Sequence, residues 1–148
     1  MDLSKLQRGE YIAIVGGALL LAGLLLPWYT TRLGRINAVA GPQSGWQVHT
    51  TMRYVLLAAA VAPLILAYIV LRDHALSWPR GELTAVIAIA CLGLIAYNGL
   101  IAQPGTSNQL TSLQSGWVVA VLGTLLMLFG SALRSSQSER KRKPPGTL

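Results

Sequence analysis

Residues 1–29 read MDLSKLQRGEYIAIVGGALLLAGLLLPWY, and this stretch decides the class of protein. Lys5 and Arg8 precede an apolar run over 11–26, and the segment 27–29, Pro-Trp-Tyr, closes it. Roughly 20 apolar residues in a helix cross a hydrocarbon core of about 30 Å. A charged collar, an apolar run and an aromatic collar in this order are typical of a transmembrane helix.

The composition supports a chain that lies mostly in lipid. Hydrophobic residues make up 53% of the 148 residues and charged residues only 11%, whereas soluble domains have roughly 25% charged residues. The sequence therefore predicts a single all-α domain over 1–148, an integral membrane four-helix bundle. Its four predicted spans cover about 11–29, 54–71, 83–102 and 117–133.

A cleaved signal peptide is the alternative interpretation of the first run. Ala38-Val39-Ala40 offers a small-x-small cleavage pattern. This pattern lies well beyond the apolar run, past Arg32 and Arg35, and the run is long for a signal core. We therefore expect a retained first span.

Orientation follows from the Lys and Arg residues close to the spans, because cytoplasmic loops carry the excess. With four spans, nine of these residues fall on one side and three on the other. We expect a multi-pass protein of the plasma membrane with both termini in the cytoplasm. The nine are Lys5, Arg8, Arg72, Arg80, Arg134, Arg140, Lys141, Arg142 and Lys143, and the three are Arg32, Arg35 and Arg53.

Two short sequence tags recur and indicate an internal repeat. Arg-Gly-Glu at 8–10 returns at 80–82, and Gln-Ser-Gly-Trp at 43–46 returns at 114–117. The two spacings are 72 and 71 residues, and six of thirteen positions match between 8–20 and 80–92. We predict two tandem transmembrane hairpins related as a parallel repeat. Chance similarity between apolar runs is the alternative.

Small residues are predicted to bring the spans together, since they permit close approach of helices in lipid. Gly116, Gly123 and Gly130 recur every seven residues in the fourth run, and Gly16 and Gly23 share that spacing in the first. The sequence alone does not show which of these faces pack within the bundle and which mediate self-association.

No constellation of catalytic or metal-binding residues is apparent, so we predict a non-enzymatic protein without cofactor or metal. The five acidic residues lie at span edges or in the tails, and Glu10 is expected at an interfacial helix start. His49 and His74 are expected on opposite sides of the membrane, so they do not share a metal. Cys91 lies mid-span and has no second cysteine with which to form a disulfide.

Three groups of residues are candidate contact sites. Aromatic side chains at the span ends are candidate interface anchors, namely Trp28, Tyr29, Trp46, Trp78 and Trp117. Tyr97 and Asn98 form a candidate polar contact inside a span. A tail over 135–148 is predicted to be disordered, and basic residues in and before it are candidate contacts for anionic lipid headgroups, namely Arg134, Arg140, Lys141, Arg142 and Lys143. A plain stop-transfer signal is the alternative role of this basic cluster.

The order of these features resembles a known type of protein. Arg-Gly-Glu, a span, Leu-Pro-Trp-Tyr at 26–29, a loop with Gly-Trp, three further spans and a basic tail are similar to small uncharacterised four-span membrane proteins of the actinobacterial type. The resemblance implies a plasma-membrane location. It carries over no functional residue.

The leading functional hypothesis is a non-enzymatic membrane accessory or interaction protein. Its expected partners are the lipid bilayer, anionic headgroups and either a second membrane protein or further copies of itself. The net charge of +7 sits at the span ends rather than along one helix face, so nucleic acid is not an expected partner. The alternative is a small passive transporter or channel, with Pro63, Tyr97 and Asn98 lining the path.

Overall fold

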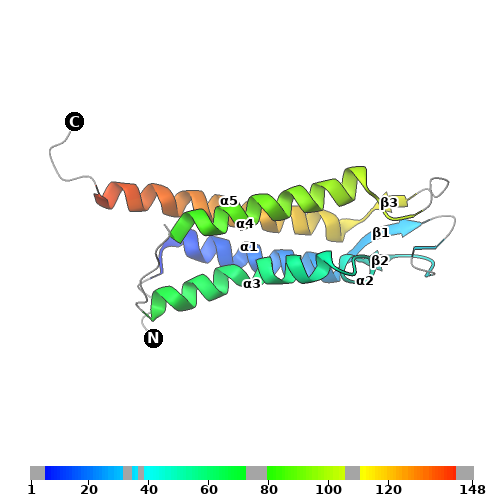
Figure 1. The fold of residues 1–148 in the computed structure, drawn as a ribbon, viewed down its shortest axis with the longest axis horizontal. Coiled ribbons are helices and arrows are strands. Elements are labelled where there is room, and N and C mark those ends of the chain that lie inside the picture. Colours follow the sequence, from blue (N-terminus) through cyan, green and yellow to red (C-terminus); the bar gives the residue numbers. More distant parts are fainter. Residues whose placement is uncertain (1–5, 32–34, 37–38, 73–79, 106–110, 143–148) are drawn as a thin grey trace.

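Four helices are long and apolar enough to cross a membrane, as the sequence predicts. The computed structural model describes residues 6–31, 35–36, 39–72, 80–105 and 111–142 (Figure 1). The four are α1 (Arg8–Leu25), α3 (Met52–Leu71), α4 (Arg80–Ala96) with its π-helical continuation η2 (Tyr97–Ile101), and α5 (Ser115–Arg142). This part of the chain is consistent with a multi-pass membrane protein.

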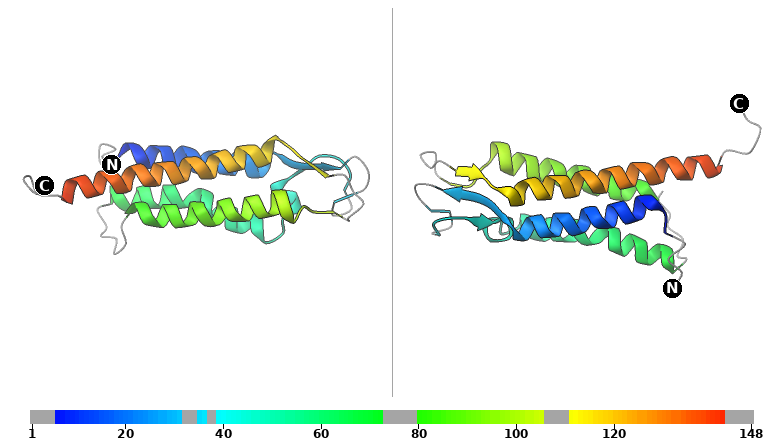
Figure 2. Two further views of the ribbon diagram at one scale, coloured as in Figure 1. Left: turned by 90° about the horizontal axis from the view of Figure 1, so that it is seen from above. Right: turned by 180° about the vertical axis from the view of Figure 1, so that it is seen from behind.

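The helices lie side by side in an elongated bundle with two different ends (Figures 1 and 2). At one end α1 begins and α5 finishes, and we call this the tail end. At the other end the connections form a small sheet, and we call this the cap end. Large apolar side chains remain exposed on all four long helices, which suits contact with lipid.

The sheet at the cap end corrects the all-α prediction. Strands β1 (Pro27–Thr31), β2 (Gln43–Ser44) and β3 (Thr111–Leu113) pair in the order β2-β1-β3, and both pairings are antiparallel. A one-turn helix, α2 (Gly45–Val48), follows β2 directly. The main body remains a four-helix bundle, and the sheet forms a cap on it.

The first span therefore ends at Leu25, and the predicted extension to Tyr29 is wrong. Leu26, the residue before a proline, has the extended backbone (ψ 158°) that such a position favours. The segment Trp-Tyr-Thr-Thr then consists of aromatic and β-branched residues that suit a strand. Strand β1 pairs with β3 from Tyr29↔Leu113 to Thr31↔Thr111. Because these partners are some 80 residues apart, local sequence pattern does not reveal the pairing.

The closest packing in the bundle joins α1 to α5, the first and last spans. A Cβ atom built on Gly16 would lie 2.6 Å from the Gly123 carbonyl oxygen, and one on Gly23 would lie 2.5 Å from the Ala120 nitrogen. The glycines of α1 thus meet those of α5 at backbone distance. Tandem hairpins pair α1 with α3 and α4 with α5, so they do not by themselves predict this seam.

Pro63 lies inside α3 and is buried, where it faces the bundle interior. It packs close to Gly17 of α1, whose hypothetical Cβ would lie 3.5 Å from the proline ring. Fully buried side chains complete the core, among them Leu20, Leu56, Ile95 and Met127. The proline therefore takes part in helix packing.

Helix α5 runs on to Arg142, so the prediction of disorder from residue 135 is wrong over 135–142. This stretch holds no Gly or Pro, and it contains Gln, Glu, Lys and Arg, which favour helices. The next prolines in the sequence are Pro144 and Pro145. The predicted tail over 143–148 lies outside the described residues.

Candidate functional site

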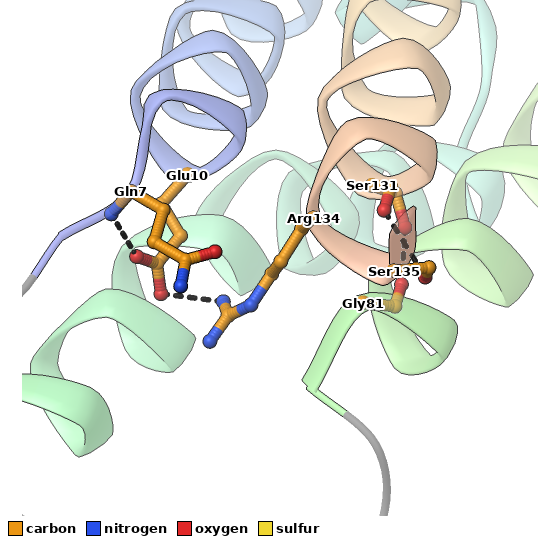
Figure 3. Close-up of polar contacts among 6 residues, drawn as sticks. All are labelled: Gln7, Glu10, Gly81, Ser131, Arg134 and Ser135. Atoms are coloured by element: carbon orange, nitrogen blue, oxygen red, sulfur yellow. Dashed lines mark hydrogen bonds and ion pairs between the residues drawn. The ribbon is translucent and has the colours of Figure 1, made fainter. Parts of the chain in front are cut away.

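A buried ion pair lies at the tail end, where Glu10 of α1 meets Arg134 of α5 (Figure 3). A guanidinium nitrogen of Arg134 lies 2.5 Å from a carboxylate oxygen of Glu10, and the two side chains are 8% and 5% exposed. The backbone N–H of Gln7 donates to Glu10 at 2.7 Å and completes a capping box at the start of α1. Ionisable groups inside a membrane bundle are costly and mark sites of interest.

This pair bears on the expectations for Glu10 and Arg134. Glu10 does lie at a helix start, and its side chain is buried within the bundle. Arg134 was a candidate contact for anionic headgroups, yet its side chain is turned into the bundle toward Glu10. The reason is tertiary: the α1–α5 seam brings a carboxylate and a guanidinium to the same level, where each neutralises the other.

The surroundings of the ion pair are polar and tightly filled. Ser131 donates a hydrogen bond to the Gly81 carbonyl and thereby joins α5 to α4 (Figure 3). A cavity of about 10 Å³ lies between Glu10, Thr84, Ser131, Arg134 and Pro63. That volume is at the lower limit of what one water molecule needs. The geometry suits a structural clamp between spans rather than a chamber for a solute.

A second cluster, at the cap end, is centred on Trp28 and Tyr29 of β1, which are fully buried. The indole N–H of Trp28 donates to the Gly23 carbonyl at 2.7 Å, and its ring lies against Gly45. The Tyr29 hydroxyl donates to the Asn98 carbonyl at 2.9 Å. Predicted as anchors at the headgroups, both side chains instead fasten the cap to the bundle.

His49 completes this cluster. Its Nε2 lies 3.4 Å from the Tyr29 hydroxyl oxygen, and its ring meets Trp28 edge-on with centroids 5.5 Å apart. Burial lowers the pKa of His49 and raises the pKa of Tyr29, since both charged forms lose hydration. Both groups are therefore neutral at pH 7.

The remaining aromatic candidates have different surroundings. Trp117 donates its indole N–H to the Ile95 carbonyl at 3.0 Å and packs against Gly99. It therefore joins α5 to α4 and η2 at the cap end. Trp46 is partly buried, and its ring meets that of Tyr54 edge-on with centroids 5.9 Å apart. Trp78 lies outside the described residues.

Tyr97 and Asn98, the candidate polar pair within a span, both belong to the π-helical turn η2. Tyr97 is 53% exposed. The Asn98 amide donates to the Leu94 carbonyl of its own helix at 2.9 Å. It is the backbone carbonyl of Asn98, accepting from Tyr29 of β1, that joins this turn to another element.

The rest of the basic cluster stays a prediction. The backbone of Arg140, Lys141 and Arg142 forms the end of α5, and Lys143 lies beyond the residues that the structure describes. Contact of these four residues with anionic lipid is untested by the geometry.

In the part of the chain that the structure describes, no group of three or more His, Cys, Asp or Glu side chains is placed to hold a metal ion. Cys91 is a buried free thiol. No family model, curated protein or solved structure matches this chain. The fold and the two clusters thus define a membrane-type four-helix bundle with a β-sheet cap, fastened at the tail end by an ion pair.

Proposed function

We propose that this chain is a non-enzymatic integral membrane accessory protein that presents its β-cap to a partner. The observation that carries the proposal is the construction of the cap. Two loops distant in sequence join in one sheet, and buried aromatic side chains fix that sheet to the helices. A surface held in this way is preorganised, which lowers the entropic cost of binding.

The cap is also stiffened from within. The amide of Gln43, itself buried, donates to the carbonyls of Ile36 and Val39 at 2.8 Å each. The backbone N–H of Gln114 donates to the Trp28 carbonyl at 2.8 Å, which ties the third loop to β1. Connecting segments that carry this much internal bonding suit a recognition role better than a simple linker role.

The positions of Pro63, Tyr97 and Asn98 support an accessory role over the passive transporter alternative. Pro63 lines a cavity of about 10 Å³ near the ion pair, whereas Asn98 lies at the cap end and bonds to its own helix. Tyr97 is exposed on the bundle surface. The cavity that Pro63 lines therefore includes neither Tyr97 nor Asn98.

The proposal includes a plasma-membrane location with the cap outside and both termini in the cytoplasm. Its support is the nine-to-three distribution of Lys and Arg residues near the spans. The tail end carries the larger number. The cap end is then the surface available to partners outside the cell.

Photo-crosslinking in native membranes tests the partner. A photoreactive amino acid at Val39 or Ser112, both exposed on the cap, is expected to capture one defined protein. The same amino acid at Ile65, exposed in the middle of α3, is the matched control and should yield lipid adducts only.

Two outcomes would contradict the proposal. One is crosslinking from Ile65 alone, with no product from the cap positions. The other is substrate-dependent flux through liposomes that contain the purified protein and its abolition by Asn98→Leu. That second result would favour the transporter alternative.

A further inference from the structure

Arg53 is held in an aromatic frame at the cap end of α3. Its guanidinium carbon lies 4.8 Å from the centroid of the Tyr54 ring and 5.2 Å from that of Trp46. One guanidinium nitrogen donates to the Tyr54 hydroxyl at 2.9 Å. Contacts with two rings fix the plane of the cation before any ligand arrives.

This cation has no acidic neighbour in its part of the chain. Between residues 11 and 72 the sequence contains no Asp or Glu at all. The acidic residues of the described helices are Glu10, Glu82 and Glu139. They lie in the first turns of α1 and α4 and in the last turn of α5, at the tail end, a bundle length away. The other basic residues on the cap side therefore add to the positive charge of Arg53, and no carboxylate there neutralises it.

The guanidinium is also partly desolvated. The Nε atom of Arg53 is buried, and among the residues that the structure describes it has no hydrogen-bond partner. A buried donor on a charged group is costly unless an acceptor compensates it. Arg53 stands in the first turn of α3, where the helix dipole disfavours a cation. The charge of Arg53 therefore does not stabilise α3. A bound anion would accept from the buried Nε donor and would offset the unfavourable interaction with the helix dipole.

The level of Arg53 in the bilayer suits a phospholipid headgroup. Helix α3 has 20 residues, and at 1.5 Å rise per residue it spans about 30 Å, the thickness of the hydrocarbon core. Arg53 is its second residue and so lies at the headgroup boundary. Below it, Tyr54 and Val55 are 55% and 47% exposed and continue into an apolar face for an acyl chain.

We propose that Arg53, framed by Trp46 and Tyr54, binds the phosphate of an anionic phospholipid at the cap end of the bundle. The guanidinium supplies the charge and donors in a fixed plane, which matches phosphate oxygens. The exposed face of α3 takes the acyl chain. This site is separate from the basic cluster at the tail end and does not require a protein partner.

Native mass spectrometry of the full chain, released from detergent with added lipid, tests the site. We compare phosphatidylglycerol with phosphatidylcholine, in the wild type and in Arg53→Gln. The matched control is Arg35→Gln, which removes the same charge from an exposed residue outside the aromatic frame. Wild type and Arg35→Gln should retain phosphatidylglycerol in preference, and Arg53→Gln should reduce that retention about tenfold.

Arg53→Lys keeps the charge but loses the planar fork. We expect Arg53→Lys to retain severalfold less phosphatidylglycerol than the wild type does. If Arg53→Gln does not fold, this variant provides the test of the lipid site. Far-UV circular dichroism reports folding. Equal retention by the wild type and a folded Arg53 variant would overturn the site, as would equal retention of the two lipids by the wild type. Loss of the lipid adduct in excess inorganic phosphate would show a site for a soluble anion, and the lipid assignment would be wrong.

Discussion

Glu10 and Arg134 are the residues at which the two ends of the chain meet. Removing both charges from water is expensive, and their attraction repays this only with good geometry. The close approach of 2.5 Å and the capping bond from Gln7 supply that geometry. A pair of this kind fixes the level of α1 against α5, since a shift of one turn would separate the charges.

Glu10→Gln is expected to destabilise the protein by about 3 kcal/mol, because Arg134 would keep a buried charge without its partner. Unfolding in mixed micelles with increasing dodecyl sulfate measures the change. Replacing both residues with leucine should restore most of the loss. Glu82→Gln, at the exposed glutamate of the second tag, is the control and should change stability by less than about 0.5 kcal/mol. Equal effects at the two glutamates would contradict a role for the ion pair.

Gly16→Ala should force α1 away from α5. The new methyl group would meet backbone atoms of Gly123 and Met127, both 2.6 Å from the ideal Cβ position. Overpacking of this kind costs about 1–3 kcal/mol. Gly93→Ala in α4 is the matched control, because no atom of the described chain lies within 4 Å of its Cβ position. The higher helix propensity of alanine should add up to about 1 kcal/mol of stability. The same detergent titration compares the two variants, and a harmless Gly16→Ala would show that the seam is loose.

At the scale of elements, a hydrogen bond joins η2 to β1. The π-helical turn gives the Asn98 carbonyl as the acceptor for the Tyr29 hydroxyl. Gly99 in the same turn leaves room for the Trp117 ring. Single π-turns are rare and often occur at functional positions. Here the turn connects the cap to the end of α4.

Tyr29→Phe is expected to cost about 1 kcal/mol, since it leaves the Asn98 carbonyl without its donor. Amide hydrogen exchange should become faster in η2 and β1 and stay unchanged at mid-bundle. Tyr97→Phe removes a hydroxyl from an exposed ring in the same turn and serves as the control. Unaltered exchange in Tyr29→Phe would mean that the hydrogen bond from Tyr29 to Asn98 is not needed to hold the cap on the bundle.

The cap is expected to lose stability on acidification. Burial lowers the pKa of His49 below 6.5, so the unfolded cap binds the proton more readily than the folded one. Stability contributed by neutral His49 is thus present above pH 6.5 and declines as pH falls through and below that value. Trp fluorescence of the cap as a function of pH measures the effect, and His49→Gln should flatten the curve. A curve of the same shape in His49→Gln would assign the loss to another group.

The whole molecule is asymmetric about its predicted repeat. Both Arg-Gly-Glu tags place their glycine against α5, Gly9 near Gly130 and Gly81 near Ser131 and Ser135. The two glutamates differ, because Glu10 is ion-paired and Glu82 is exposed. Closure of the bundle by the first and last spans therefore gives the two copies of the tag different surroundings. The duplication itself stays a prediction.

Orientation is a property of the whole chain, and reporter fusions test it. A reporter that is active outside the cytoplasm should be active after Ser112 and inactive after Leu76. The reason is the excess of Lys and Arg at the tail end. Cytoplasmic activity after Ser112 would place the cap inside the cell and would contradict the proposed partner surface.

The sequence by itself determined the four spans, the lack of charge at mid-span and the heptad spacing of small residues in the first and fourth runs. These features are local, because apolar run length and glycine spacing follow from helix geometry and bilayer thickness. Only the tertiary structure decided the rest. It paired β1 with β3, turned Trp28 and Tyr29 inward and brought Glu10 to Arg134. Each of these contacts joins positions far apart in the chain, so its free energy depends on which surfaces meet, and no local pattern encodes that choice.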